Sequence, residues 1–108
     1  MRPATGSQRI ELDDASIDLE KRQVTRHGAL LRLTPVEFRL VATLAKHMGM
    51  VVTHKQLLRE VWGPTHEADT HYLRVYVKQL RDKLEADPGQ PRHFITEPGV
   101  GYRLEPKE

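Results

Sequence analysis

The spacing of apolar residues changes at residue 34, and this change constrains the fold more than any other feature of the sequence. From residue 9 to residue 33 apolar and polar residues alternate in short runs, as Ile10 and Leu12 do around Glu11. This alternation is typical of strands with one buried face. His27-Gly28 separates two runs, and glycine readily adopts the positive φ of a tight hairpin. We therefore predict an antiparallel sheet of about four strands here.

After residue 34 the apolar residues recur at helical spacing, and the first helix has a well-marked start. Thr34 can cap it, Pro35 suits its first turn, and Glu37 can complete a capping box. Gly49 is placed to end it in the left-handed conformation. Its predicted buried face consists of Phe38, Val41, Leu44, Ala45 and Met48.

Two more helices and a hairpin are predicted further along the chain. Thr53–Gln56 resembles a second capping box, and its helix, which buries Leu57, Leu58, Val61 and Trp62, ends at Gly63-Pro64. Asp69 or Thr70 can cap a third helix that extends to about residue 85. Residues 93–97 and 102–104 then form strands around a glycine-rich turn. The predicted fold is α+β: a winged helix-turn-helix with an N-terminal four-stranded antiparallel sheet, a three-helix core and a C-terminal β-hairpin wing. Residues 1–8 are expected to be a linker-like tail and residues 9–106 the domain.

Composition excludes several classes of protein. A chain of 108 residues is the size of one domain. It has no cysteine, and no apolar run long enough to span a bilayer or to serve as a signal peptide, so we expect a cytoplasmic protein that does not contact a membrane. No nucleotide-binding or hydrolase motif is present, so we expect neither an enzyme nor a cofactor. His66 and His71 lack a clear third ligand, so we expect no metal site.

The third predicted helix has an apolar side and a basic side. Its core face consists of Leu73, Tyr76, Val77, Leu80 and Leu84. The opposite side consists of His71, Arg74, Val75, Lys78, Gln79 and Asp82, with Arg81 on its flank. Basic side chains suit phosphate and guanine, glutamine suits adenine, and an exposed valine suits the thymine methyl group. Solvation of an ordinary surface helix explains the charges equally well, and the same face could instead bind a protein. The order of elements, with a glycine-tipped hairpin directly after the basic helix, favours DNA.

Four stretches of the sequence resemble the effector domain of OmpR/PhoB-family response regulators. They are Leu33–Leu40, Gln56–Gly63, Leu80–Leu84 and Gly99–Arg103. The resemblance implies transcription control by a head-to-tail dimer bound to tandem direct repeats in double-stranded promoter DNA. It also implies a bacterial two-component system, in which a sensor kinase phosphorylates a preceding receiver domain. This sequence contains no receiver domain, so we expect it to be part of a longer regulator. Within the family, residues 71–76 and 91–97 look most similar to the regulator of potassium-transport operons.

The resemblance also assigns candidate DNA contacts residue by residue. Val75, Lys78 and Gln79 match positions that face base edges, and Arg74 lies beside them. Positions that approach phosphates are matched by His54, Trp62, His71, Arg81, Thr96 and Tyr102. Trp62 and Tyr102 are also good candidates for core packing. Many relatives carry an arginine at the wing tip that enters the minor groove, whereas this chain has Pro98 before Gly99. Backbone contact at the wing tip, or a contact by Arg103, is therefore the expected substitute for that arginine. The loop Gly63–Asp69 is implied to be the surface that contacts RNA polymerase.

Overall fold

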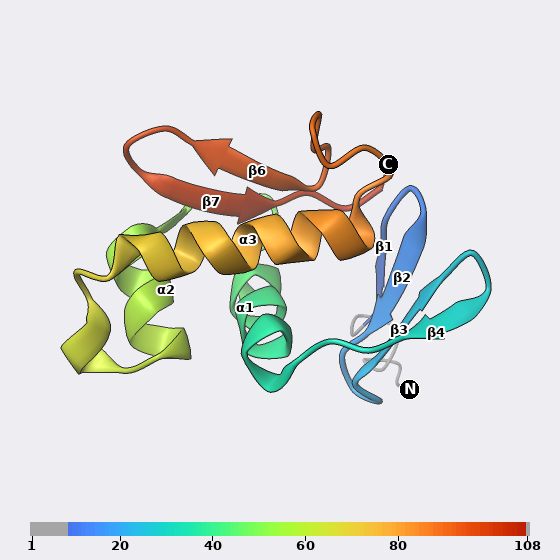
Figure 1. The fold of residues 1–108 in the computed structure, drawn as a ribbon, viewed down its shortest axis with the longest axis horizontal. Coiled ribbons are helices and arrows are strands. Elements are labelled where there is room, and N and C mark those ends of the chain that lie inside the picture. The colour runs from blue at the N-terminus through green and yellow to red at the C-terminus, as the bar shows by residue number, and fades with distance from the viewer. Residues whose placement is uncertain (1–8, 108) are drawn as a thin grey trace, which may run out of the picture.

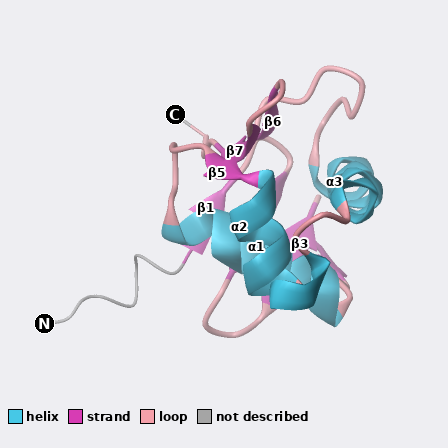
Figure 2. Ribbon diagram, turned by 90° about the vertical axis from the view of Figure 1, so that its left-hand side faces the viewer, coloured by secondary structure: helices cyan, strands magenta, loops and turns pink. Residues whose placement is uncertain are grey.

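The structure is a computed structural model that describes residues 9–107. Figure 1 shows the N-terminal sheet beside one end of the longest helix, α3, and the C-terminal hairpin running along that helix. In Figure 2, where α3 is seen end on, it lies at the periphery of the molecule. The predicted tail at residues 1–8 lies outside the described residues. None of the helices described is both long enough and apolar enough to cross a bilayer.

The predicted winged helix-turn-helix architecture is confirmed. The first sheet has the order β1-β2-β3-β4 and consists of β1 (Arg9–Glu11), β2 (Ala15–Asp18), β3 (Gln23–Arg26) and β4 (Ala29–Leu31). The helices are α1 (Pro35–Lys46), α2 (His54–Val61), the 3₁₀ turn η2 (Pro64–His66) and α3 (Thr70–Leu84). The second sheet has the order β5-β7-β6 and consists of β5 (Val52–Thr53), β6 (Phe94–Glu97) and β7 (Gly101–Leu104).

The first sheet is an antiparallel meander with one buried face, as its alternating sequence predicts. Ile17 is paired with Ile10 on one side and with Val24 on the other, and all three side chains are buried. His27 and Gly28 have φ values of 53° and 80°, so both central residues of the β3–β4 turn are left-handed. This is the backbone of a type I′ turn, whose twist matches that of the flanking strands.

The capping box of α1 is present, but the predicted buried face of this helix was wrong in part. Thr34 Oγ1 accepts from the Glu37 amide at 3.2 Å, and Glu37 Oε1 accepts from the Thr34 amide at 2.9 Å. Leu40, which we did not place in the core, is fully buried. Phe38 is only partly buried, with the Arg22 guanidinium 4.7 Å from its ring centroid. The buried stripe is therefore rotated toward Leu40, since α1 packs against α2, α3 and β7.

The caps of α2 and α3 lie at the predicted residues but differ in mechanism. Thr53 accepts from the Gln56 amide at 3.1 Å, whereas the Gln56 side chain does not complete a box and donates instead to Glu60 Oε2 at 2.9 Å. That hydrogen bond lowers the pKa of Glu60, as does the nearby Lys46, against the opposing effect of burial. Asp69 is the N-cap residue of α3, but its side chain accepts no hydrogen bond from the helix, because its carboxylate lies 2.9 Å from His66 Nδ1.

A third strand, β5, joins the predicted hairpin and was missed from the sequence. Val52 and Thr53 pair with Tyr102 and Gly101, so the wing is fixed to the chain just before α2. A Cβ atom on Gly101 would lie 1.9 Å from the Val52 carbonyl oxygen. Only glycine allows the two strands to approach this closely.

We therefore expect Gly101→Ala to lower the free energy of unfolding by about 2 kcal/mol, because the added methyl group forces β5 and β7 apart. Urea denaturation followed by circular dichroism measures this change. Gly89→Ala is the matched control, since its added Cβ would lie at an ordinary 3.4 Å from Asp87 Oδ1. Equal urea midpoints for Gly101→Ala and the parent would show that the strands are not in such close contact.

Candidate nucleic-acid interface

The two predicted sides of α3 are both found in the structure. Its core face is anchored by four buried residues, Leu73, Val77, Leu80 and Leu84, whereas Tyr76, also predicted there, is only partly buried. Its outer side presents five exposed residues: His71, Arg74, Val75, Lys78 and Gln79. Val75 is 49% exposed, so part of its apolar surface faces solvent. The outer side therefore offers donors, an amide and a methyl surface on one rigid element.

Some basic side chains of α3 face solvent, and others are held by carboxylates of the domain. Arg74 is exposed and forms none of the ion pairs found among residues 9–107. Lys78 contacts Asp82 at 3.0 Å, but its side chain remains 77% exposed. Lys83, in contrast, lies 2.7 Å from the buried Glu37 carboxylate. The cations that face solvent therefore lie toward the beginning and middle of the helix.

Arg81 is held by the wing. Its Nε and Nη2 donate to the Phe94 carbonyl oxygen at 2.9 and 2.7 Å, and Nη2 also donates to Thr96 Oγ1 at 2.7 Å. Two of the predicted phosphate contacts, Arg81 and Thr96, are thus brought together and bonded to each other. Their assignment to phosphate stays a prediction.

The turn of the wing is compact and tied to α2. Gly99 has φ 76°, and the Val100 amide donates back to the Glu97 carbonyl oxygen at 3.0 Å. The Val100 carbonyl oxygen accepts from the His54 amide at 3.1 Å. Gly99 and Val100 are both exposed beside the start of α2, and Gly99, which has no side chain, exposes its backbone there.

The predicted contacts in β7 are less accessible than those on α3. Tyr102 is only 6% exposed and packs edge to face against His54, with 5.5 Å between ring centroids. Arg103 forms ion pairs with Glu97 and with Glu105, the latter at 2.8 Å. These two carboxylates hold its guanidinium, and its assignment as a substitute for a wing-tip arginine stays a prediction.

An aromatic cluster stands at the beginning of α3, and its central member was missed from the sequence. Tyr72 lies between two predicted contacts, with ring centroids 5.9 Å from Trp62 and 4.4 Å from His71. Trp62 is partly buried and also contacts Tyr76 at 5.4 Å. Tyr72 was overlooked because helical spacing places it at the border of the two faces of α3. The cluster fixes where Trp62 and His71 lie.

The loop between α2 and α3 is held against α2 by charge. Glu67 lies 3.3 Å from Arg59 Nε and 3.7 Å from Lys55 Nζ. The loop contains the 3₁₀ turn η2, and Pro64, Thr65 and Ala68 within it are exposed. The loop is therefore a structured surface rather than a free connection.

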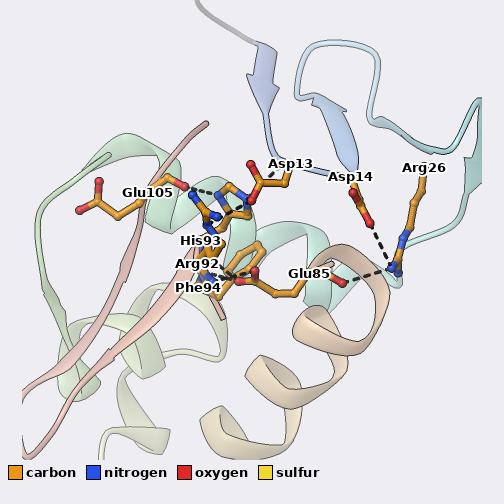
Figure 3. A network of polar contacts seen from close by, with 8 residues as sticks. All are labelled: Asp13, Asp14, Arg26, Glu85, Arg92, His93, Phe94 and Glu105. Atoms are coloured by element: carbon orange, nitrogen blue, oxygen red, sulfur yellow. Dashed lines mark hydrogen bonds and ion pairs between the residues drawn. The ribbon is translucent and has the colours of Figure 1, made fainter. Parts of the chain in front are cut away.

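A buried polar network at the end of α3 was also missed from the sequence (Figure 3). Glu85 is 1% exposed, and its carboxylate accepts from the amides of Arg92, His93 and Phe94 at 2.9, 2.9 and 2.7 Å. His93 is 2% exposed; its Nε2 accepts from the Asp13 amide at 2.9 Å and its Nδ1 donates to the Glu105 carbonyl oxygen at 2.7 Å. No cluster of potential metal ligands occurs in the part of the chain that the structure describes.

An exposed basic helix, a preceding capped helix and a three-stranded wing define a winged helix-turn-helix domain. Residues 28–104 match the family described as transcriptional regulatory protein, C terminal, and the chain belongs to this family, in its OmpR/PhoB type. The family is non-enzymatic, which confirms that the chain is not an enzyme.

Particular relatives refine this assignment. The chain is 50% identical over 95 residues to the KDP operon transcriptional regulatory protein KdpE of Escherichia coli, an alignment that covers 88% of this chain and 42% of KdpE. The response regulator DrrB of Thermotoga maritima, an OmpR/PhoB homologue, has a TM-score of 0.78 at 30% identity and covers 91% of this chain and 44% of DrrB. The structure of the DNA-binding domain of Klebsiella pneumoniae RstA in complex with the RstA box has a TM-score of 0.77 at 27% identity. The match covers 93% of this chain and 99% of the RstA domain. The chain thus spans about two fifths of its curated relatives.

Proposed function

We propose that this chain binds double-stranded promoter DNA sequence-specifically, as the effector domain of a two-component response regulator. The observation that carries the proposal is the exposed outer side of α3, where Arg74, Val75 and Lys78 stand on a helix anchored by buried leucines. A helix of this kind fits the major groove, and the wing beside it can approach the flanking backbone. The RstA domain, similar in fold along its whole length, was determined in complex with its DNA box, which supports the proposal.

A finer proposal concerns the operon. Half of the aligned residues are identical to those of KdpE, whose name refers to the KDP operon. We propose that this chain controls a potassium-transport operon.

The contacts that we propose divide into two sets. Val75, Lys78 and Gln79 face base edges, with Arg74 beside them, because these side chains share the exposed side of one helix. The set proposed to touch or approach phosphate is His54, Trp62, His71, Arg81, Thr96 and Tyr102. At the wing, backbone contact at Gly99 or the side chain of Arg103 is the proposed substitute for a wing-tip arginine. Gly99 is exposed at the wing turn, and we propose that it contributes its backbone rather than a groove-reading side chain.

Further partners are proposed from the family resemblance. Two copies bind head to tail on a tandem direct repeat, a receiver domain precedes the domain of residues 9–106, and residues 1–8 belong to the connecting linker. The loop Gly63–Asp69 contacts RNA polymerase in the bacterial cytoplasm. The exposure of this loop and its fixation through Glu67 suit such a contact.

Lys78→Ala tests the proposed function. We expect it to weaken binding to a duplex selected from a random pool by roughly 1–3 kcal/mol and to relax the preference at one base pair, because a base-edge donor is lost. Fluorescence anisotropy gives the affinities, and repeated selection gives the preference.

The matched control is Lys46→Ala, which also removes an exposed lysine paired with a carboxylate, Glu60 at 3.3 Å, but on α1. It should bind the selected duplex as the parent does. If Lys78→Ala and Lys46→Ala have equal affinities and equal preferences, α3 does not read bases through Lys78.

A further inference from the structure

One side chain of the N-terminal sheet, Arg26, contacts the end of α3. Arg26, the last residue of β3, donates from Nη1 to the Lys83 carbonyl oxygen at 2.8 Å and to that of Asp82 at 3.3 Å. Its Nη2 donates to the Glu85 carbonyl oxygen at 3.1 Å. The last carbonyl groups of a helix lack intrahelical partners, and a cation there also complements the helix dipole. Arg26 therefore acts as a long-range cap for α3.

The position of Arg26 is fixed by the register of the sheet. It pairs with Ala15 and Ala29 on the neighbouring strands and shares the inward side of β3 with the buried Val24. Asp14 lies 3.9 Å from Nη2 and orients the guanidinium, and the Arg26 side chain is only 25% exposed (Figure 3). The guanidinium thus points into the body of the domain.

The same end of α3 is also tied to the wing. Glu85 leaves the helix in an extended conformation, with φ −84° and ψ 143°, and its carboxylate holds the backbone at the start of β6. Arg81 adds the bonds to Phe94 described above. Polar bonds therefore concentrate at the end of α3, whereas the candidate base contacts lie nearer its beginning.

We propose that Arg26 is a positioning residue for sequence recognition: by holding the end of α3 against the first sheet, it sets the angle at which the helix presents its base contacts. This inference rests on the proposed function. Arg74 lies ten residues before Leu84, or about 15 Å along the helix axis. A tilt of about 5° at Leu84 would move Arg74 by about 1 Å, beyond the roughly 0.5 Å that directional contacts tolerate.

This role predicts a loss of selectivity rather than of general affinity. Hydrogen bonds to base edges depend steeply on distance and angle. The attraction of cations to phosphate varies slowly over the same displacement, and Arg26 is not among the proposed DNA contacts. A tilted α3 would therefore lose discrimination while keeping its sequence-independent binding.

The test compares Arg26→Gln, Arg26→Lys and the control Arg39→Gln, which removes an equal charge from an exposed position on α1. Anisotropy is measured on the duplex selected by the parent and on a random duplex, over a series of salt concentrations. We expect Arg26→Gln to bind the selected duplex about tenfold more weakly and the random duplex within about twofold of the parent. Arg26→Lys, which keeps the cation near the carbonyl groups, should recover part of the loss, and Arg39→Gln should match the parent.

The salt series separates positioning from contact. Removing a phosphate contact lowers the slope of log K against log salt by about 0.9, whereas removing a positioning residue leaves it unchanged. A lowered slope for Arg26→Gln, or equal losses on both duplexes, would overturn the inference. If circular dichroism shows that Arg26→Gln does not fold, Arg26→Lys provides the test. We then expect its affinity for the selected duplex to fall about threefold, with no loss on the random duplex. An unchanged affinity of Arg26→Lys for the selected duplex would contradict the inference. If the parent itself shows no preference for any duplex, the proposed function fails instead.

Discussion

Glu85→Ala is expected to lower the free energy of unfolding by about 4 kcal/mol, the largest effect on stability that we predict, because it leaves three amide donors without their acceptor. These are the amides of Arg92, His93 and Phe94, two of which lie in buried residues. An unsatisfied buried donor costs about 1–3 kcal/mol, and the exposed Arg92 is the one that water can reach. Urea denaturation at neutral pH measures the change.

Glu85→Gln is the matched comparison for this prediction. It keeps the length of the side chain and one acceptor oxygen, so we expect it to lose about half as much. A change below about 1 kcal/mol for Glu85→Ala would contradict the proposed network, because the three amides would then have other partners.

Val75→Asp should have the largest effect on binding. We expect it to weaken binding to both the selected and the random duplex by about a hundredfold or more, because it places a carboxylate on the side of α3 that faces the DNA. The free energy of unfolding should remain close to that of the parent, since the Val75 side chain is 49% exposed. Anisotropy titrations at constant salt measure the affinity.

Leu30→Asp provides the control for charge. It makes the same change of net charge at a side chain that is 73% exposed on β4, at the edge of the N-terminal sheet. We expect its affinity to stay within about threefold of the parent's. Similar losses in the two variants would show that net charge matters and the outer side of α3 does not.

Features fixed by neighbouring residues could be predicted from the sequence. The cap of α1 depends on Thr34 and Glu37, and the β3–β4 turn depends on His27-Gly28. Each of these features is therefore determined by residues that are close together in the sequence. The core face of α3 follows from helical spacing alone. These local patterns, taken in order along the chain, were enough to predict the architecture and the exposed side of α3.

Features that depend on residues distant in sequence could not be predicted. Arg26 contacts carbonyl groups 56 to 59 residues away, and nothing near it indicates them except its inward position in the strand after Val24. The sequence places Arg81 on the flank of the basic side, and it cannot show that the Phe94 carbonyl oxygen lies within reach of this side chain. Strand β5 has two residues, too few for any periodicity, and forms by pairing with β7.

Dimethyl sulfate interference on the selected duplex tests most directly whether the outer side of α3 reads bases in the major groove. Methylation of guanine N7 modifies the major groove, where Lys78 would donate. We expect N7 methylation at specific guanines to block binding by the parent, and Lys78→Ala to become insensitive at one of them while Lys46→Ala does not. Binding that tolerates N7 methylation throughout, or an identical interference pattern for Lys78→Ala and the parent, would contradict base reading by α3.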